Sequence, residues 1–350
     1  MSALSGRSLQ QSLWKLSRRF LTSRQLVYSE RGNPSKVVKL TNVDLSETLG
    51  PKQVLIRWLA APVNPADINQ IQGVYPVKPP LPAVGGSEGV GEVEKVGTDV
   101  SGFTQGDRVV IVRSGAGTWQ TLGIYDAEDL VKIDKNMSLE SAATFQVNPP
   151  TAYRMLSDFV TLRQGDLVIQ NGANCTVGRA VIQIAHARGV RTVNLIRKSD
   201  HSEKVIEELK KLGADEVHTE DEMLKEYKGK VKNAKLAFNC VGGRSTLILA
   251  SCLGQDGVLV TYGGMSKQPL QIPTGPLIFK NIHLRGFWMT EWYKQPENKK
   301  KRAEMFEKLS ELVRQGKLQP PNVDKRSLDD WQVALEKGES GTGNKQLFIM

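Results

Sequence analysis

The first third of the chain alternates apolar and polar positions in short runs that glycine and proline interrupt. Alternation with a period of two is typical of strands, and Gly and Pro mark the turns between them. The pattern therefore predicts a compact, barrel-like β domain. Its expected strands cover residues 25–28, 36–40, 53–60, 89–96 and 107–112.

From Asp166 onward, apolar β-branched runs alternate with segments whose apolar residues recur at helical spacing. Such alternation indicates an α/β fold with a doubly wound parallel sheet. The expected strands cover residues 167–170, 192–196, 216–219, 236–241, 257–262 and 283–287, and the expected helices 177–187, 202–212 and 245–253. Ligands bind such a sheet beyond the carboxyl ends of its strands, which directs attention to the segments that follow them.

The two patterns are joined by a helical stretch over residues 138–156, in which Pro149 and Pro150 mark a helix start or junction. A further helix is expected over 302–315. Ser327 and Asp330 predict a capped helix over 328–336. The last run, residues 346–349, predicts a strand that returns to the N-terminal domain.

The stretch from Asp166 to Ser199 outlines a strand, a tight turn, a helix and a second strand. Such a βαβ unit can hold a dinucleotide pyrophosphate at the N-terminus of its helix. Gly172 and Gly178 fit the glycine fingerprint, whereas Cys175 and Thr176 stand where glycines are common. A buried crossover that binds no ligand would have the same hydrophobic pattern.

The end of the second strand of this unit bears on which dinucleotide is bound. NAD-binding units carry Asp or Glu about 20 residues past the glycines, where the carboxylate accepts from a ribose hydroxyl. Here Arg197, Lys198 and Ser199 follow the strand, and no carboxylate occurs before Asp200. Two cations favour a 2′-phosphate, so we expect NADPH. The alternative is an ordinary solvated loop.

The net charge of +10 is concentrated in part at the N-terminus. Residues 1–24 hold five Arg and Lys and no acid, and Leu9, Leu13, Leu16 and Phe20 can share one helical face. This composition is typical of a mitochondrial transit peptide. A basic tail without a targeting role is the alternative. The remaining positive charge is scattered, and no nucleic-acid-binding motif is visible. No run approaches the roughly 18 apolar residues of a membrane span.

Cysteine and histidine usage argues against a metal site. The cysteines are Cys175, Cys240 and Cys252, without a CxxC pair, which is typical of a reducing compartment. The segment GGSEGVGEVEKVG resembles one in zinc-dependent alcohol dehydrogenases, but Ser87 stands where a ligand histidine would be. A tetrahedral zinc site is therefore not expected. A proton donor from the protein must then replace the metal.

The candidate donor is Tyr75, in the segment NPADINQIQGVYP. We expect Asp67 to cap a short helix over 68–72 and Tyr75 to lie in the loop beyond it. A phenol can donate a proton when a nearby positive charge draws its pKa toward neutrality. By composition alone, a loop tyrosine is more often a packing residue.

Six separated motifs together resemble the mitochondrial trans-2-enoyl-thioester reductases, a zinc-free family of the medium-chain dehydrogenase/reductase superfamily. They are NPADINQIQGVYP, LPAVGGSEGVGEVEKVG, QVNPPTAYRML, GDLVIQNGANCTVGRAVIQIA, YGGMSKQP and LRGFWMTEW. The resemblance implies NADPH-dependent reduction of enoyl groups on CoA or acyl carrier protein in mitochondrial fatty acid synthesis. It also implies a homodimer in the mitochondrial matrix.

The resemblance assigns the proton donor to Tyr75. The NADPH contacts that it implies are Asn148, Asn174, Cys175, Thr176, Val177, Arg197, Lys198, Ser199, Tyr262, Gly263, Gly264, Met265, Phe287, Trp288, Met289 and Lys345. The chain departs from the family at Cys175 and Thr176, because a threonine cannot adopt a positive φ cheaply.

The resemblance also divides the chain. It implies a transit peptide over 1–23, a GroES-like catalytic domain over 24–148, a Rossmann-type NADPH domain over 149–313 and a return to the catalytic domain over 314–350. Two alternatives stay open: an NADPH quinone oxidoreductase of the same superfamily, and a non-catalytic NADPH-binding protein.

Overall fold

The computed structural model describes residues 20–226, 229–341 and 343–350. The transit-peptide prediction therefore lies outside the described residues, except at its end. Strand β1 (Phe20–Tyr28) begins before residue 23, so the expected boundary falls inside a strand, where Ser23 donates a hydrogen bond to the carbonyl of Leu122. Among the described residues, no helix is long and apolar enough to cross a membrane.

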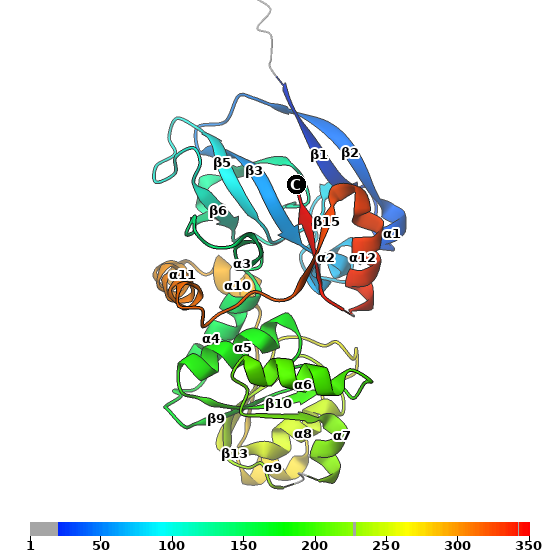
Figure 1. The fold of residues 1–350 in the computed structure, drawn as a ribbon, viewed down its shortest axis with the longest axis vertical. Coiled ribbons are helices and arrows are strands. Elements are labelled where there is room, and N and C mark those ends of the chain that lie inside the picture. Colours follow the sequence, from blue (N-terminus) through cyan, green and yellow to red (C-terminus); the bar gives the residue numbers. More distant parts are fainter. Residues whose placement is uncertain (1–19, 227–228, 342) are drawn as a thin grey trace, which may run out of the picture.

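The first domain contains two sheets, whose strands pair antiparallel except for the parallel pair β15–β16 (Figure 1). One sheet has the order β2-β1-β4, with β2 (Val38–Ser46) and β4 (Ala83–Val84) on either side of β1. The other has the order β15-β16-β3-β5-β6-β8, and β7 pairs with β3. Its N-terminal members are β3 (Gln53–Pro62), β5 (Val90–Val96), β6 (Arg108–Ile111), β7 (Leu122–Asp126) and β8 (Leu130–Lys132).

Two helices in this half differ from the sequence prediction. The predicted strand over 36–40 is preceded by a short helix, α1 (Pro34–Val37), which Asn33 caps through its side chain. Helix α2 (Pro65–Gln72) begins earlier than predicted, because Pro65 suits the first helical position. Asp67 is consequently not the cap: it lies inside the first turn and accepts from the Asn64 backbone N–H at 2.9 Å.

The joining region also differs from the prediction of one helical stretch. It forms two helices, α3 (Leu139–Ala143) and α4 (Asn148–Asp158), with a break between them. Ser138 caps α3 by accepting from Ser141 N. Pro149 and Pro150 lie in the first turn of α4, where the missing N–H groups cost nothing, so they start a new helix.

The second half contains a parallel sheet with the strand order β11-β10-β9-β12-β13-β14. This is the order 3-2-1-4-5-6 of dinucleotide-binding sheets, which confirms the predicted fold class. Every predicted strand is present: β9 (Leu167–Gln170), β10 (Arg191–Ile196), β11 (Glu216–Thr219), β12 (Ala234–Asn239), β13 (Leu253–Thr261) and β14 (His283–Gly286).

Helices cover this sheet and lead back from it. Those in the predicted places are α5 (Thr176–Ala187), α6 (Ser202–Lys211), α8 (Ser245–Cys252) and α11 (Lys299–Arg314). The short helices α7 (Glu220–Lys225), α9 (Thr274–Phe279) and α10 (Met289–Lys294) were not predicted. A run of buried apolar residues under α4 and α5, including Met155, Val181 and Phe306, joins the first domain's interior to this sheet.

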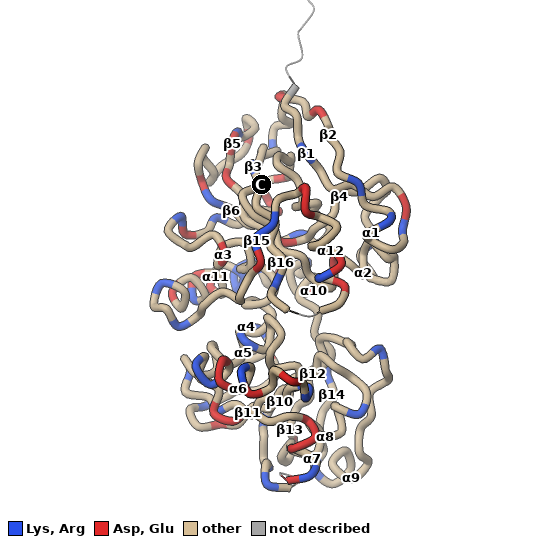
Figure 2. The backbone as a smooth tube through the Cα atoms, turned by 45° about the vertical axis from the view of Figure 1, so that its right-hand side comes forward, with Lys and Arg blue, Asp and Glu red and all other residues tan. Residues whose placement is uncertain are grey.

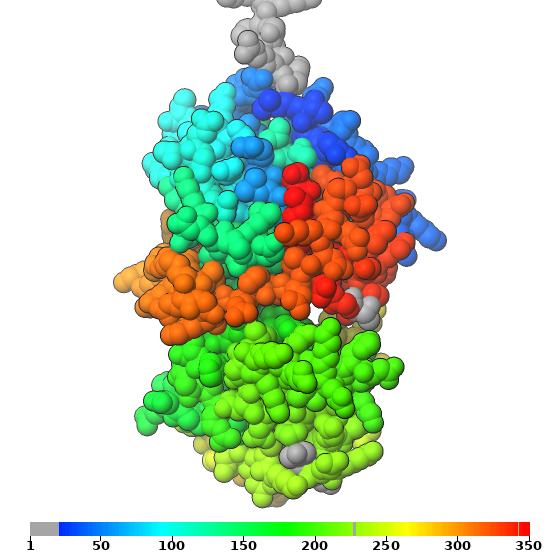
Figure 3. Space-filling model, in the orientation of Figure 1, coloured from blue at the N-terminus to red at the C-terminus, as the bar shows by residue number. Residues whose placement is uncertain are grey.

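The chain then returns to the first half. Strand β15 (Val323–Ser327) leads to α12 (Trp331–Ser340) and to β16 (Lys345–Ile349), which pairs antiparallel with β3. The predicted return strand is therefore confirmed. In space-filling view the two halves form two lobes, with α11 across their junction (Figure 3). Basic and acidic residues are interspersed over both (Figure 2).

Candidate functional site

The segments that follow the parallel strands meet at the carboxyl edge of the sheet, as expected. Backbone bonds tie neighbouring segments together: Met265 N donates to Cys240 O, and Phe287 N donates to Thr261 O. This edge faces the first domain, where Tyr75, Glu88 and Lys345 lie. The site is thus a seam between the two halves.

The dinucleotide turn connects β9 to α5. Gly172 has a φ of +58°, so the left-handed residue of the turn is a glycine. Cys175 is the N-cap of α5, with its Sγ accepting from Gly178 N at 3.3 Å, and Thr176 is the first helical residue. The expected strain at Thr176 does not arise. Gly178 is required, because a Cβ there would lie 2.5 Å from the Ala173 carbonyl oxygen.

Buried amide side chains hold this turn from below. Gln170 Nε2 donates to Gly178 O at 2.9 Å and to Asn194 Oδ1 at 2.8 Å, which links β9, α5 and β10. Asn171 Nδ2 donates to Asn239 Oδ1 at 2.8 Å, and Asn171 Oδ1 accepts from Cys240 N. Buried polar groups that are bonded in this way fix the turn in one conformation.

Cys175, Cys240 and Tyr262 form a polar cluster at the turn. The Cys175 Sγ lies 3.8 Å from the Tyr262 hydroxyl oxygen. The neighbouring Cys240 thiol and the Gly178 N–H lower the pKa of Cys175, whereas the Cys175 thiol and burial raise that of Cys240. Two of the predicted contacts, Cys175 and Tyr262, are therefore brought together.

Arg197, Lys198 and Ser199 follow β10 and are exposed, as the NADPH hypothesis requires. Within the described residues neither cation forms a salt bridge of 4.0 Å or less with a carboxylate. Both charges remain available to an anion.

Tyr75 lies in the loop after α2, whose C-cap Gly73 has a φ of +79°. Its hydroxyl oxygen accepts from Trp288 Nε1 at 2.8 Å, and the two rings meet edge to face. The predicted donor therefore contacts the predicted cofactor segment Phe287–Met289. Burial raises the Tyr75 pKa, so the residues around it in the structure do not draw it toward neutrality. A raised pKa keeps the phenol protonated.

Asn148 and Lys345 complete the side of the seam nearest the first domain. The Asn148 Nδ2 is buried and has no hydrogen-bond partner among the described residues. An unpartnered buried donor is costly, and an acceptor on a bound NADPH would satisfy it. Lys345 Nζ donates to Asn64 Oδ1 at 2.6 Å, and burial lowers its pKa. This site therefore fits an anionic dinucleotide.

For the remaining predicted NADPH contacts, the described part of the chain gives a position and an exposure but no side-chain hydrogen bond to the rest of the site. Asn174 is exposed and its carbonyl accepts from Arg179 Nε, whereas Val177 is buried on α5. Gly263, Gly264 and Met265 follow β13, and the Met265 side chain is 61% exposed. Met289 is buried at the start of α10.

Sequence reasoning missed the buried polar residues of the first domain, Asn64, Asp67 and Glu88. Burial raises the Asp67 pKa to about 6 and also raises that of Glu88. The sequence signal that could have pointed to Asp67 and Glu88 is a carboxylate beside small residues, in NPAD and in GGSEG. That signal does not show that the carboxylates are buried, because burial depends on the fold.

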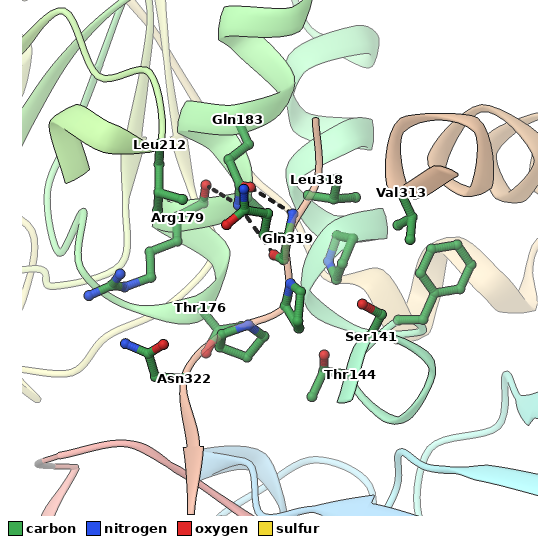
Figure 4. A pocket seen from close by; sticks show the side chains of 15 residues that line it. Ser141, Thr144, Thr176, Arg179, Gln183, Leu212, Val313, Leu318, Gln319 and Asn322 are labelled. Carbon is green, nitrogen blue, oxygen red and sulfur yellow. Dashed lines mark hydrogen bonds between the residues drawn. The ribbon is translucent and has the colours of Figure 1, made fainter. Parts of the chain in front are cut away.

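A cavity of about 90 Å³ lies behind the turn, between α3, α5 and residues 318–322 (Figure 4). Gln183 Oε1 accepts from Gln319 N at 2.7 Å there, and Gln183 Nε2 donates to Gln319 O at 3.4 Å. Thr176 is the predicted contact that lines it. Beside this cavity, the segment that returns to the first domain, residues 318–322, is hydrogen-bonded to α5.

Within the described residues, no group of three His, Cys, Asp or Glu side chains could hold a metal ion. Ser87, at the position of the ligand histidine, has its hydroxyl oxygen accepting from Gly115 N at 3.1 Å.

Comparison with known proteins agrees with this architecture. Residues 50–135 match the family described as alcohol dehydrogenase GroES-like domain, and residues 176–310 match zinc-binding dehydrogenase. The mitochondrial enoyl-[acyl-carrier-protein] reductase of Caenorhabditis elegans is 52% identical over 97% of this chain and 98% of its own. That of Homo sapiens is 46% identical over 93% and 88%.

Solved structures show the same relationship. A mutant form of enoyl thioester reductase from Candida tropicalis is 33% identical, with a TM-score of 0.87 over 94% of this chain and 100% of its own. The Etr1p complex with NADP and crotonyl-CoA is 32% identical, with a TM-score of 0.88 over the same shares. The chain thus belongs to the enoyl-[acyl-carrier-protein] reductases of the medium-chain dehydrogenase/reductase superfamily.

Proposed function

We propose that this enzyme uses NADPH to reduce the 2,3 double bond of trans-2-enoyl thioesters, carried on CoA or acyl carrier protein. The observation that carries the proposal is the contact between Tyr75 and Trp288, which holds a protonated phenol at the carboxyl edge of the cofactor sheet. The names of the relatives and the crotonyl-CoA complex of Etr1p support the substrate class.

The chain's own residues account for binding and for the proton. Arg197 and Lys198 would meet the 2′-phosphate, the α5 N-terminus the pyrophosphate, and Asn148 and Lys345 the part of the dinucleotide near the first domain. Further proposed contacts are Asn174, Cys175, Thr176, Val177, Ser199, Tyr262, Gly263, Gly264, Met265, Phe287, Trp288 and Met289. When bound, NADPH supplies a hydride to C3. Tyr75 gives its proton to C2 as charge leaves the thioester oxygen.

We further propose that residues 24–148 and 314–350 form the catalytic domain and 149–313 the NADPH domain. Pairing of β16 with β3 supports this division. The proposed location is the mitochondrial matrix, where the reaction would serve fatty acid synthesis. The relatives' names and the free thiols of Cys175, Cys240 and Cys252 support a reducing mitochondrial compartment.

An NADPH-consumption assay tests the activity. We expect NADPH oxidation with crotonyl-CoA and longer trans-2-enoyl-CoA, and a product heavier by two hydrogens in mass spectrometry. Benzoquinone serves as the comparison substrate. If only the quinone is turned over, the protein is a quinone reductase. If neither substrate is turned over, it is a non-catalytic NADPH-binding protein.

A homodimer through the edge of the cofactor sheet is expected. Strand β14 is the edge strand, all of its residues are exposed, and Leu284 on it is 41% exposed. Nearby α9 presents Ile278 (63% exposed) and Phe279 (81% exposed). An open strand edge beside apolar side chains is suited to pairing with a second copy. The Etr1p/Etr2p pair from Candida tropicalis is itself a heterodimer.

Sedimentation velocity tests this arrangement. The wild-type protein should sediment at about twice the mass of one chain, and Ile278→Asp/Phe279→Asp should sediment as a monomer because charges cannot be buried unpaired. Val333→Asp, at an exposed position on α12, is the control and should remain dimeric. A monomeric wild type would refute the proposal.

A further inference from the structure

Glu88 lies where four segments of the chain meet. It precedes β5 and is fully buried. Its neighbours are Asn64 at the start of α2, Val147 at the start of α4, and, through Asn64, Lys345 at the start of β16. All four residues lie in the first domain, and Val147 leads directly into α4 at the junction with the second half.

Asn64 and Val147 each donate a hydrogen bond to the Glu88 carboxylate. Its Oε2 accepts from Asn64 Nδ2 at 2.8 Å, and its Oε1 accepts from Val147 N at 2.8 Å. Because the Asn64 amide donates toward the carboxylate, its Oδ1 is turned the other way, where it accepts from Lys345 Nζ at 2.6 Å. Glu88 thereby sets which end of the Asn64 amide meets Lys345.

The charges of this network depend on each other. Burial raises the Glu88 pKa, which the Lys345 ammonium opposes, and burial lowers the Lys345 pKa, which Glu88 and Asp67 oppose. Buried charges of this kind persist as a pair, and removing one leaves the other uncompensated.

The bond to Val147 acts on the second proposed NADPH contact. Val147 directly precedes Asn148, whose Nδ2 is buried and unpartnered within the described residues. Holding the Val147 N–H fixes the backbone from which the Asn148 side chain projects. One carboxylate is therefore bonded to the supports of both Lys345 and Asn148.

We infer that Glu88 is a positioning residue for NADPH, which holds Lys345 and Asn148 in their binding orientations from beneath. It acts through these two residues and does not itself touch the substrate or the dinucleotide. The inference rests on the proposed function, because that function assigns NADPH contacts to Lys345 and Asn148.

Glu88→Gln tests the role. The introduced amide has one acceptor oxygen, so either Val147 N or Asn64 Nδ2 loses its partner. We expect the NADPH dissociation constant, measured by fluorescence titration, to rise roughly 10- to 100-fold, by analogy with the loss of metal affinity when a residue that orients a metal ligand is removed. The kcat at saturating NADPH and the KM for crotonyl-CoA should stay within about threefold. Glu92→Gln, on β5 and paired with the exposed Arg57, is the matched control.

The double variant Asn64→Asp/Glu88→Gln tests whether restoring the hydrogen bond between positions 64 and 88 restores NADPH binding. The introduced glutamine would donate to the introduced aspartate and still accept from Val147 N, while the aspartate accepts from Lys345. The hydrogen bond between positions 64 and 88 is reversed, and the number of buried charges is unchanged. NADPH affinity should return to within about fivefold of wild type. If Glu88→Gln alone does not fold, the double variant still tests the role of Glu88.

Thermal unfolding without NADPH separates binding from folding. An unchanged NADPH affinity in folded Glu88→Gln, or a folded double variant that still binds weakly, would overturn the role of Glu88. Lys345→Ala and Asn148→Ala locate the failure. If neither variant weakens NADPH binding, the proposed contacts are themselves wrong. If both weaken it and Glu88→Gln does not, the role of Glu88 alone is wrong.

Discussion

Replacing Tyr75 by phenylalanine should lower kcat about 10²- to 10⁴-fold, the range for loss of a general acid. The variant keeps the ring that packs edge to face on Trp288 and removes only the hydroxyl that accepts from Trp288 Nε1. The affinity for NADPH should change by less than about threefold, because the phenol is proposed to meet the substrate. Stopped-flow measurement of NADPH oxidation separates the reduction step from product release.

The control is Tyr153→Phe on α4, where the ring stacks under the Arg188 guanidinium at 4.4 Å. That variant should turn over at the wild-type rate. Activity of Tyr75→Phe within tenfold of wild type would remove Tyr75 from the mechanism. A large rise in the NADPH dissociation constant would instead indicate that the hydroxyl serves the cofactor.

Removing both cations after β10 should reverse the choice of cofactor. In Arg197→Ala/Lys198→Ala we expect kcat/KM with NADPH to fall roughly 100-fold, since each charge-assisted bond to a phosphate is worth about 1.5 kcal/mol or more. The value with NADH, which has no 2′-phosphate, should change little. Steady-state kinetics with both cofactors measure the ratio.

Lys210→Ala/Lys211→Ala, in the last turn of α6, provides the matched control, because it removes the same charge from the same lobe. If that pair lowers NADPH efficiency equally, the effect is one of net charge and not of contact. Equal use of NADH and NADPH by the wild type would discard the argument from Arg197 and Lys198 altogether.

Much of the fold could be read from the sequence because its signals are local. The apolar runs that become β9, β10 and β12 each have a glycine close to at least one end, and the order of strands and helices determines a parallel sheet. The carboxyl edge then follows from topology, without any side-chain contact. The same reasoning led to Arg197 and Lys198, since both directly follow a predicted strand.

The parts of the site that could not be predicted from the sequence depend on how distant segments pack. Tyr75 and Trp288 are 213 residues apart, and nothing local to either indicates their hydrogen bond. The direction of the Tyr75 pKa shift also depends on distant packing: burial at the seam raises the pKa more than the hydrogen bond from Trp288 lowers it, and the Asp67 charge raises it further. The hydrogen bonds that Glu88 makes with Val147 and Asn64 likewise join residues that are far apart in the sequence.

Thr176 shows a subtler limit. Sequence comparison suggested strain, because it assigned the left-handed conformation to the wrong residue of the turn. The structure gives that conformation to Gly172 and makes Thr176 the first residue of α5, where a β-branched side chain is tolerated.

The return of the chain to the first domain orders the events of folding. Strands β9 to β14 come from one continuous stretch, so the cofactor sheet can assemble as soon as that stretch is available. Strand β16 lies between β15 and β3, and it comes after all the rest. During synthesis, the first domain can therefore be completed only after the last residues of the chain have been made.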